Sequence, residues 1–302
     1  MNKTLTKLIK RNIKLFFKDK GMFFVSLITP AILLVLYATF LGNVYRDSFL
    51  MAVPEGIVVA DSIVNGFVGG QLASSILAVC TVTIAFCSNM LMVQDKAKGA
   101  LYDLTVSPVS PSTLAIGYYI STLISTLIIS YSAAAICFGY MGVMGWYMST
   151  VDVILLLADI FILVMFGTAL SSTIGFFLST EGQISAVGTI ISSGYGFICG
   201  AYMPISQFSD GLQKIICLLP GTYGTALIRN HCLGGVLREM ENEGIPSELL
   251  ESFRDAFDCN IYFFDTKVSV PVMYTVLIST VLAVIGVYVV LNITLGKKAR
   301  AK

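Results

Sequence analysis

The sequence predicts an all-α integral membrane protein with six transmembrane helices in a single transmembrane domain over residues 1–302. Hydrophobic residues make up 56% of the 302 residues, charged residues only 12%, and the mean hydropathy is +0.84. Soluble domains carry about 25% charged residues, so an ordinary soluble globule is excluded. Long stretches also lack charge altogether, and no Asp, Glu, Lys or Arg occurs from Ser62 to Gln94.

Residues 1–20 predict an amphipathic helix lying in the membrane interface. Apolar residues from Leu5 to Phe17 recur at spacings of three and four, and lysines occupy the other side. This helix is either a simple positive anchor or an elbow that moves with a partner. The apolar stretch after it exceeds the 7–15 residues of a signal-peptide core and no A-x-A-like site follows, so we expect no cleaved leader.

Six stretches are apolar enough to span a bilayer, which takes about 20 residues. They cover about 21–42, 63–93, 114–145, 153–178, 184–204 and 269–295. A cytoplasmic start places 13 of the 19 Lys and Arg in cytoplasmic segments and the other six outside. Because positive loops are retained in the cytoplasm, we expect a multi-pass plasma-membrane protein with both termini cytoplasmic.

The outer segment 205–268 predicts re-entrant helices before the last span. Its apolar run "IICLL" is too short to span before Pro220 and Gly221 interrupt it, and the stretch 246–258 predicts a small acidic helix. The segment is interpreted as an outer gate or, equally, as a rigid cap. The candidate gate residues are Pro220, Gly221, Tyr223 and Arg229.

Three cysteines of the outer segment leave the disulfide state open. Cys217, Cys232 and Cys259 allow one disulfide with one thiol left over, and the pairing cannot be read from the sequence.

The polar loop Gln94–Thr113 predicts a cytoplasmic coupling helix. Leu101 and Leu104 lie three residues apart between Gly99 and Pro108, which indicates a short helix with an apolar face. Such a face suits a groove on a soluble partner, with nearby charges fixing the register. The candidate docking residues are Asp95, Lys98, Gly99, Leu101, Asp103, Leu104 and Pro108.

Asp159 lies inside the fourth predicted span, where an ionisable residue indicates a proton relay or a cation site. The alternative is that it faces a water-filled cavity or a hydroxyl of a neighbouring helix. No basic residue of the spans offers an obvious partner, and the single histidine, His231, is expected at the outer interface.

Catalytic and nucleotide-binding motifs are absent from the sequence. It contains no H-E-x-x-H, no G-x-S-x-G and no G-x-x-x-x-G-K-[ST]. We therefore expect no catalytic residues, no metal site and no cofactor on this chain, and any ATP that drives it must bind another chain.

The chain resembles the membrane (permease) subunit of a type-2 ATP-binding cassette exporter. Besides the basic first helix, the stretches "KAKGALYDLTVSPVS" and "LPGTYGTALIRNHCLGG" are similar to the family patterns G-T-L-E-x-L-L-x-T-P-V-S and L-P-x-T-Y…R…G-G. Ala100 replaces the usual Thr of the first pattern. The resemblance implies a second membrane subunit, two separate ATPase subunits that hold ATP and Mg, and export through the interface between the membrane subunits.

Two other functions remain open at this point. An ion-coupled secondary transporter fits Asp159, although its halves often show a repeat that is missing here, and a membrane-embedded enzyme has only Asp152 and Asp159 as candidate groups. Drugs, lipids, peptides and glycans are all possible cargoes. A small lipophilic substrate is expected, because the spans are lined mainly by apolar, Ser and Thr side chains. The basic residues indicate a membrane surface and no nucleic acid.

Overall fold

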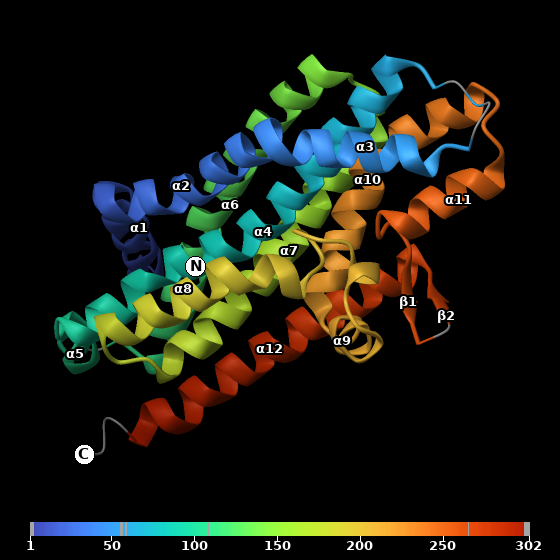
Figure 1. The fold of residues 1–302 in the computed structure, drawn as a ribbon. Helices are drawn as coiled ribbons and strands as arrows, with labels where there is room; N and C mark the ends of the chain where they lie inside the picture. The colour runs from blue at the N-terminus through green and yellow to red at the C-terminus, as the bar shows by residue number, and fades with distance from the viewer. Residues whose placement is uncertain (1–2, 55–56, 58, 108, 265, 299–302) are drawn as a thin grey trace.

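The computed structural model describes residues 3–54, 57, 59–107, 109–264 and 266–298, and these form a bundle of helices (Figure 1). The all-α prediction is confirmed, with one small exception, an antiparallel hairpin of β1 and β2 that the sequence did not predict. The elements are α1 (Lys3–Lys18), α2 (Lys20–Leu36), η1 (Tyr37–Leu41), α3 (Gly42–Ala52), α4 (Asp61–Ala97), α5 (Ala100–Val106), α6 (Pro111–Met144), α7 (Thr150–Phe177), α8 (Glu181–Ile198), η2 (Ile205–Gln207), α9 (Asp210–Ile216), α10 (Pro220–Asn242), α11 (Ser247–Ala256), β1 (Ile261–Phe263), β2 (Thr266–Val268) and α12 (Val270–Lys298).

Several long helices begin at side chains that satisfy their free amide groups. Ser110 accepts from the amide of Thr113 at the start of α6, with Pro111 as the first helical residue. Ser149 at α7 and Thr180 at α8 each form a capping box with the residue three positions on. The sequence therefore fixes where these helices begin.

Helix α4 is the centre of the bundle. It packs against α1, α2, α3, α6, α7, α8 and α10, and its residues are buried along most of its length. Gly70 lets α10 approach closely, because a Cβ there would lie 2.9 Å from the carbonyl oxygen of Cys232. The absence of charge from Ser62 to Gln94 thus reflects burial within the protein as well as depth in the membrane.

Four helices of the described part of the chain are long and apolar enough to cross a membrane. They are α4, α6, α7 and the Val270–Thr294 part of α12. The predicted first span, about 21–42, lies in α2 and the π-helical segment η1, which continue without a gap into α3. The predicted fifth span lies in α8 and the turn after it. The count of six crossings stays a prediction.

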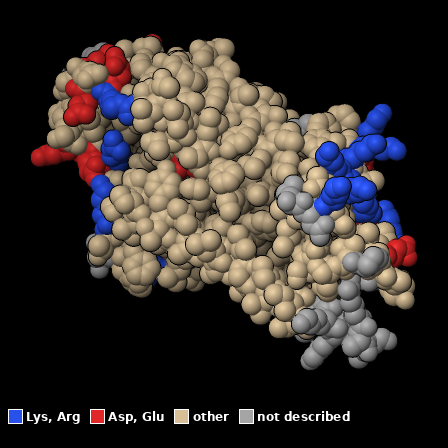
Figure 2. All heavy atoms as spheres, turned by 180° about the vertical axis from the view of Figure 1, so that it is seen from behind, with Lys and Arg blue, Asp and Glu red and all other residues tan. Residues whose placement is uncertain are grey.

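The two ends of the bundle differ in charge. On the face shown in Figure 2, one end carries mainly Lys and Arg, the other carries most of the visible Asp and Glu together with some Lys and Arg, and a broad, largely uncharged belt lies between them. The basic end carries α1 and α5, and the acidic end carries α11 and the hairpin. This separation is the pattern that the Lys and Arg distribution of the sequence predicts for a protein crossing a bilayer.

Candidate coupling helix and buried polar contacts

A short helix, α5, lies where the sequence predicts the coupling helix, at the tip of the basic end of the bundle (Figure 1). Gly99 precedes it with φ of +78°, a left-handed conformation that glycine adopts without strain. Tyr102 and Val106, one turn apart, are 71% and 70% exposed. Leu101 and Leu104 are half-buried, and Asp103 is exposed. Pro108 lies outside the described residues.

Asp95 is turned away from the exposed side of α5. It is 7% exposed, accepts from Arg11 of α1 at 2.7 Å and from the Tyr118 hydroxyl of α6 at 2.5 Å. The hydrogen bond with Asp95 raises the pKa of Arg11, although partial burial opposes it, so the guanidinium stays charged. Asp95 therefore joins the interfacial helix to the bundle.

The next residue, Lys96, makes a different connection. Its ammonium donates to the carbonyl oxygens of Gly175, Phe176 and Leu178 at 2.9, 2.8 and 3.2 Å, at the C-terminal end of α7. A cation at this position satisfies carbonyls left free by the helix end. Lys98, a predicted docking residue, lies 3.5 Å from Glu181 at the start of α8, with both side chains more than half exposed.

The predicted gate residues are part of one long helix. Pro220 is the first residue of α10, and Gly221 packs so closely that a Cβ there would lie 2.6 Å from the Tyr195 hydroxyl of α8. The Tyr223 hydroxyl donates to the Cys217 carbonyl oxygen at 2.7 Å, closing the turn after α9. These residues lie together in the first turn of α10, a helix of 23 residues that ends at Asn242.

Arg229 is fully enclosed in the middle of α10. Its guanidinium donates to the carboxylate of Asp258 at 3.3 Å and to the Gly200 carbonyl oxygen at 3.0 Å. Asp258 also accepts from the Ile205 amide at 3.0 Å, and burial raises its pKa to about 6 while Arg229 opposes that shift. This ion pair ties the loop after α8 and the loop after α11 to α10.

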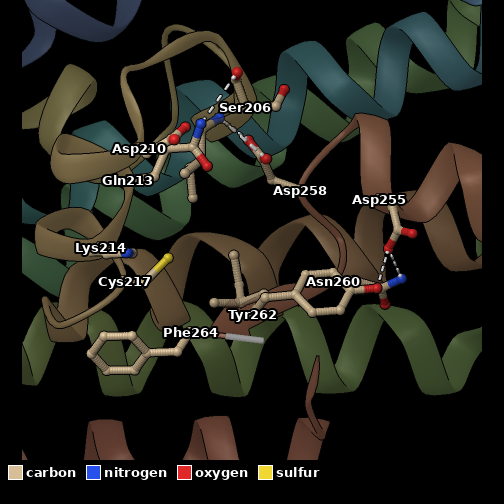
Figure 3. A pocket seen from close by; sticks show the side chains of 12 residues that line it. Ser206, Asp210, Gln213, Lys214, Cys217, Asp255, Asp258, Asn260, Tyr262 and Phe264 are labelled. Atoms are coloured by element: carbon tan, nitrogen blue, oxygen red, sulfur yellow. Dashed lines mark hydrogen bonds between the residues drawn. The ribbon is translucent and has the colours of Figure 1, made fainter. Parts of the chain in front are cut away.

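A cavity of about 410 Å³ opens beside this ion pair on the outer side (Figure 3). Its lining comes from α9 and from the chain around the β-hairpin, with Asp258 on one side and Lys214 on another. Asp255 binds Asn260 and the Tyr262 hydroxyl, so this carboxylate is engaged within the wall.

Asp159 has two partners from two other helices. Its carboxylate lies 2.5 Å from Nδ1 of His231 on α10 and accepts from the Tyr274 hydroxyl of α12, also at 2.5 Å. We expected no basic residue of the spans to partner Asp159, and the partner found, His231, comes from the outer segment. Helix α10 places His231 inside the bundle, where it is 9% exposed. The expected neighbouring hydroxyl is present as Tyr274.

A second acidic residue of α7 pairs with α10 in the same way. Asp152, in the capping box of α7, accepts from Arg238. Asp152 and Asp159 are seven residues apart, and so are His231 and Arg238, which places each pair on one face of its helix, since seven residues make about two turns. The matched spacing was visible in the sequence and is the signal that could have found this contact.

Residues 4–231 match the family model of the ABC-2 type transporter. The chain belongs to the ABC-2 type transporter family. It is the membrane permease component of an ABC exporter, a multi-pass membrane protein, and the resemblance noted in the loop and in the outer segment is confirmed. No curated protein matches the chain.

All seven cysteines of the permease are free thiols in the structure. Cys217, Cys232 and Cys259 are buried, and each lies in or beside α10 or the loops that contact it. None of the disulfides that the sequence left open is formed.

Proposed function

We propose that this permease moves a small lipophilic substrate, drug-like or lipid, outward across the plasma membrane. ATP hydrolysis drives it from two separate ATPase subunits that bind ATP and Mg, and a second membrane subunit completes the transporter. The observation that carries the proposal is α5, a short helix with exposed Tyr102 and Val106 at the basic end of the bundle. An exposed apolar helix face rimmed by charge suits a groove on a soluble partner.

The contacts around α5 support its use for coupling. Asp95 binds Arg11 of α1 and Tyr118 of α6, Lys96 binds the end of α7, and Lys98 pairs with Glu181 of α8. A displacement of α5 by an ATPase subunit therefore acts on four helices as well as on α4. A loop that only connects two spans would need none of these contacts. It could also be shorter, since connections of 2–8 residues are usual in bundles.

Two apolar cavities support a lipophilic substrate. One of about 810 Å³ lies between the α2–α3 helix and the chain after α8, with aromatic walls that include Tyr37, Phe40 and Tyr45. Another of about 520 Å³ lies between α2, α4 and α8 and adds Ser and Thr hydroxyls of α8. Leu33 and Tyr202 line both. Mostly apolar walls with a few polar groups are typical of small-molecule sites.

The proposed orientation has six crossings, with both termini in the cytoplasm and α11 outside. Single cysteines at Asn2, Glu243 and Ala301 in a cysteine-free background test it with an impermeant thiol reagent on intact cells. Labelling of Glu243 alone is expected. Labelling of either terminal position, or protection of Glu243, would overturn the orientation.

The exporter itself is tested by affinity purification of the full chain from its native membrane. We expect an ATPase subunit to accompany it, and the reconstituted complex to accumulate a lipophilic dye in inverted vesicles only with ATP and Mg. Accumulation that needs no ATP and follows an imposed proton gradient would instead establish the secondary transporter. Purification of an active transporter without any ATPase would reject the proposal.

A further inference from the structure

Asp159, His231 and Tyr274 bring three helices together inside the bundle. The Asp159 side chain is 1% exposed and that of His231 11%, and both carboxylate oxygens of Asp159 have partners. Asp159 follows the start of α7 at Thr150 by nine residues, about 14 Å along the helix axis. The group thus lies well below the outer end of the bundle.

Among the residues that the structure describes, no charged side chain near these three is left to balance them. Helix α4 carries no charge from Ser62 to Gln94, and neither α6 nor the Val270–Thr294 part of α12 carries any. Where α7 contacts α10, the other charged residues already have partners. Asp152 pairs with Arg238 of α10, and Arg229 pairs with Asp258 of an outer loop.

Other titratable groups around α10 among the described residues include tyrosines such as Tyr195 and Tyr223, thiols and outer acids. Cys137 of α6 and Cys232 of α10 are the neighbouring thiols. On α11, which packs against α10, Glu251 binds Lys267 and Asn260, and Asp255 binds Tyr262 and Asn260. None of them supplies a positive charge to Asp159.

The charge of the cluster decides its protonation. A carboxylate beside a neutral imidazole leaves one uncompensated negative charge in a medium of low polarity, which is strongly unfavourable. One added proton removes it, giving either an imidazolium–carboxylate pair or a carboxylic acid beside a neutral imidazole. Both forms keep the hydrogen bonds of Asp159 to His231 and Tyr274.

We propose that Asp159, His231 and Tyr274 form a proton-binding site that holds one proton while α10 is packed on α7 and α12. The proton passes to water when these helices separate and the group becomes hydrated. In water, a carboxylate binds no proton at neutral pH, and an imidazole, with a pKa of about 6.5, is mostly neutral above pH 7. Acid therefore stabilises the packed arrangement, and alkaline pH favours separation.

The same helix links this site to export, a step that rests on the proposed function. Pro220, Gly221 and Tyr223 form the start of α10, so motion of that helix during export carries His231 with it. If outward opening separates α10 from α7, transport increases as the pH rises from about 6 to 8.

The number of protons held by the folded state is measured on the full chain in the absence of any ATPase subunit. Equilibrium unfolding in mixed detergent micelles is compared for the wild type and Asp159→Asn between pH 6.5 and 7.5. Their ratio of unfolding constants is expected to change about tenfold per pH unit, the slope for one proton retained by the folded wild type. His231 is the single histidine of the chain, so no other imidazole contributes.

Matched variants and a second readout complete the test. Asp152→Asn removes a carboxylate from the same face of α7 and is expected to keep the wild-type slope. An equal slope in the wild type and Asp159→Asn would overturn the proposal. If Asp159→Asn does not fold, an indicator dye counts protons released when the wild type unfolds at pH 7.5, and release of none overturns it equally. Failure to recover an ATPase subunit rejects the exporter and leaves this measurement unaffected.

Discussion

The docking face proposed on α5 can be tested by changing Tyr102 and Val106 to Ser. The two side chains are 71% and 70% exposed, so a partner can bury about seven-tenths of each. Full burial of a large apolar side chain is worth about 1.5–3 kcal/mol, which leaves about 1–2 kcal/mol for each residue. Together they account for about 2–4 kcal/mol, or a rise in Kd of about 30-fold to about 900-fold.

The assay is titration of the purified ATPase subunit against the permease in nanodiscs. Val143→Ser is the matched control, because Val143 is 86% exposed but lies at the opposite end of α6. The control is expected to bind as the wild type does. A Kd within threefold of the wild type for a normally inserted Tyr102/Val106 variant would refute the assignment of this face.

Three further changes test the contacts that hold the helices in place. Asp258→Asn leaves Arg229 buried without its anion and is expected to lower the free energy of unfolding, measured in detergent, by about 3–5 kcal/mol. Replacing both residues by apolar ones should recover part of this loss of stability. Lys96→Met removes three hydrogen bonds at the end of α7 and should speed amide exchange there, whereas Lys96→Arg should retain protection. Gly235→Ala forces a Cβ against a backbone carbonyl and should lower the free energy of unfolding by about 1–3 kcal/mol. Gly139→Ala, with open space around the Cβ, should leave it unchanged. Equal stability of the two variants would contradict the packing.

Local patterns in the sequence were sufficient for the short amphipathic helices. The spacing of apolar residues gave α1, α5 and the helix near 246–258, because each pattern lies within a few turns. The local sequence did not show which side of α5 is exposed, because that depends on how α5 packs against the rest of the bundle. Leu101 and Leu104 form its apolar pair in the sequence, yet the structure half-buries them and exposes Tyr102 and Val106.

Contacts between distant segments were beyond what composition and periodicity provide. His231 and Tyr274 lie 72 and 115 residues from Asp159 in the sequence, and only the mutual packing of α7, α10 and α12 brings them together. The outer segment looked like short pieces because Pro220 and Gly221 suggest an interruption. In the fold, proline occupies the first turn of α10, where its missing amide hydrogen is no loss.

The neighbouring residues Asp95 and Lys96 restrict how the end of α4 can move. Successive side chains on an α-helix point about 100° apart, so the two residues reach different neighbours, Asp95 contacting α1 and α6 and Lys96 contacting α7. A twist of α4 about its axis stretches both connections at once, and so does a slide along it. These contacts therefore link the ends of the four helices at the basic end of the bundle, so that a displacement of one of these ends is transmitted to the others.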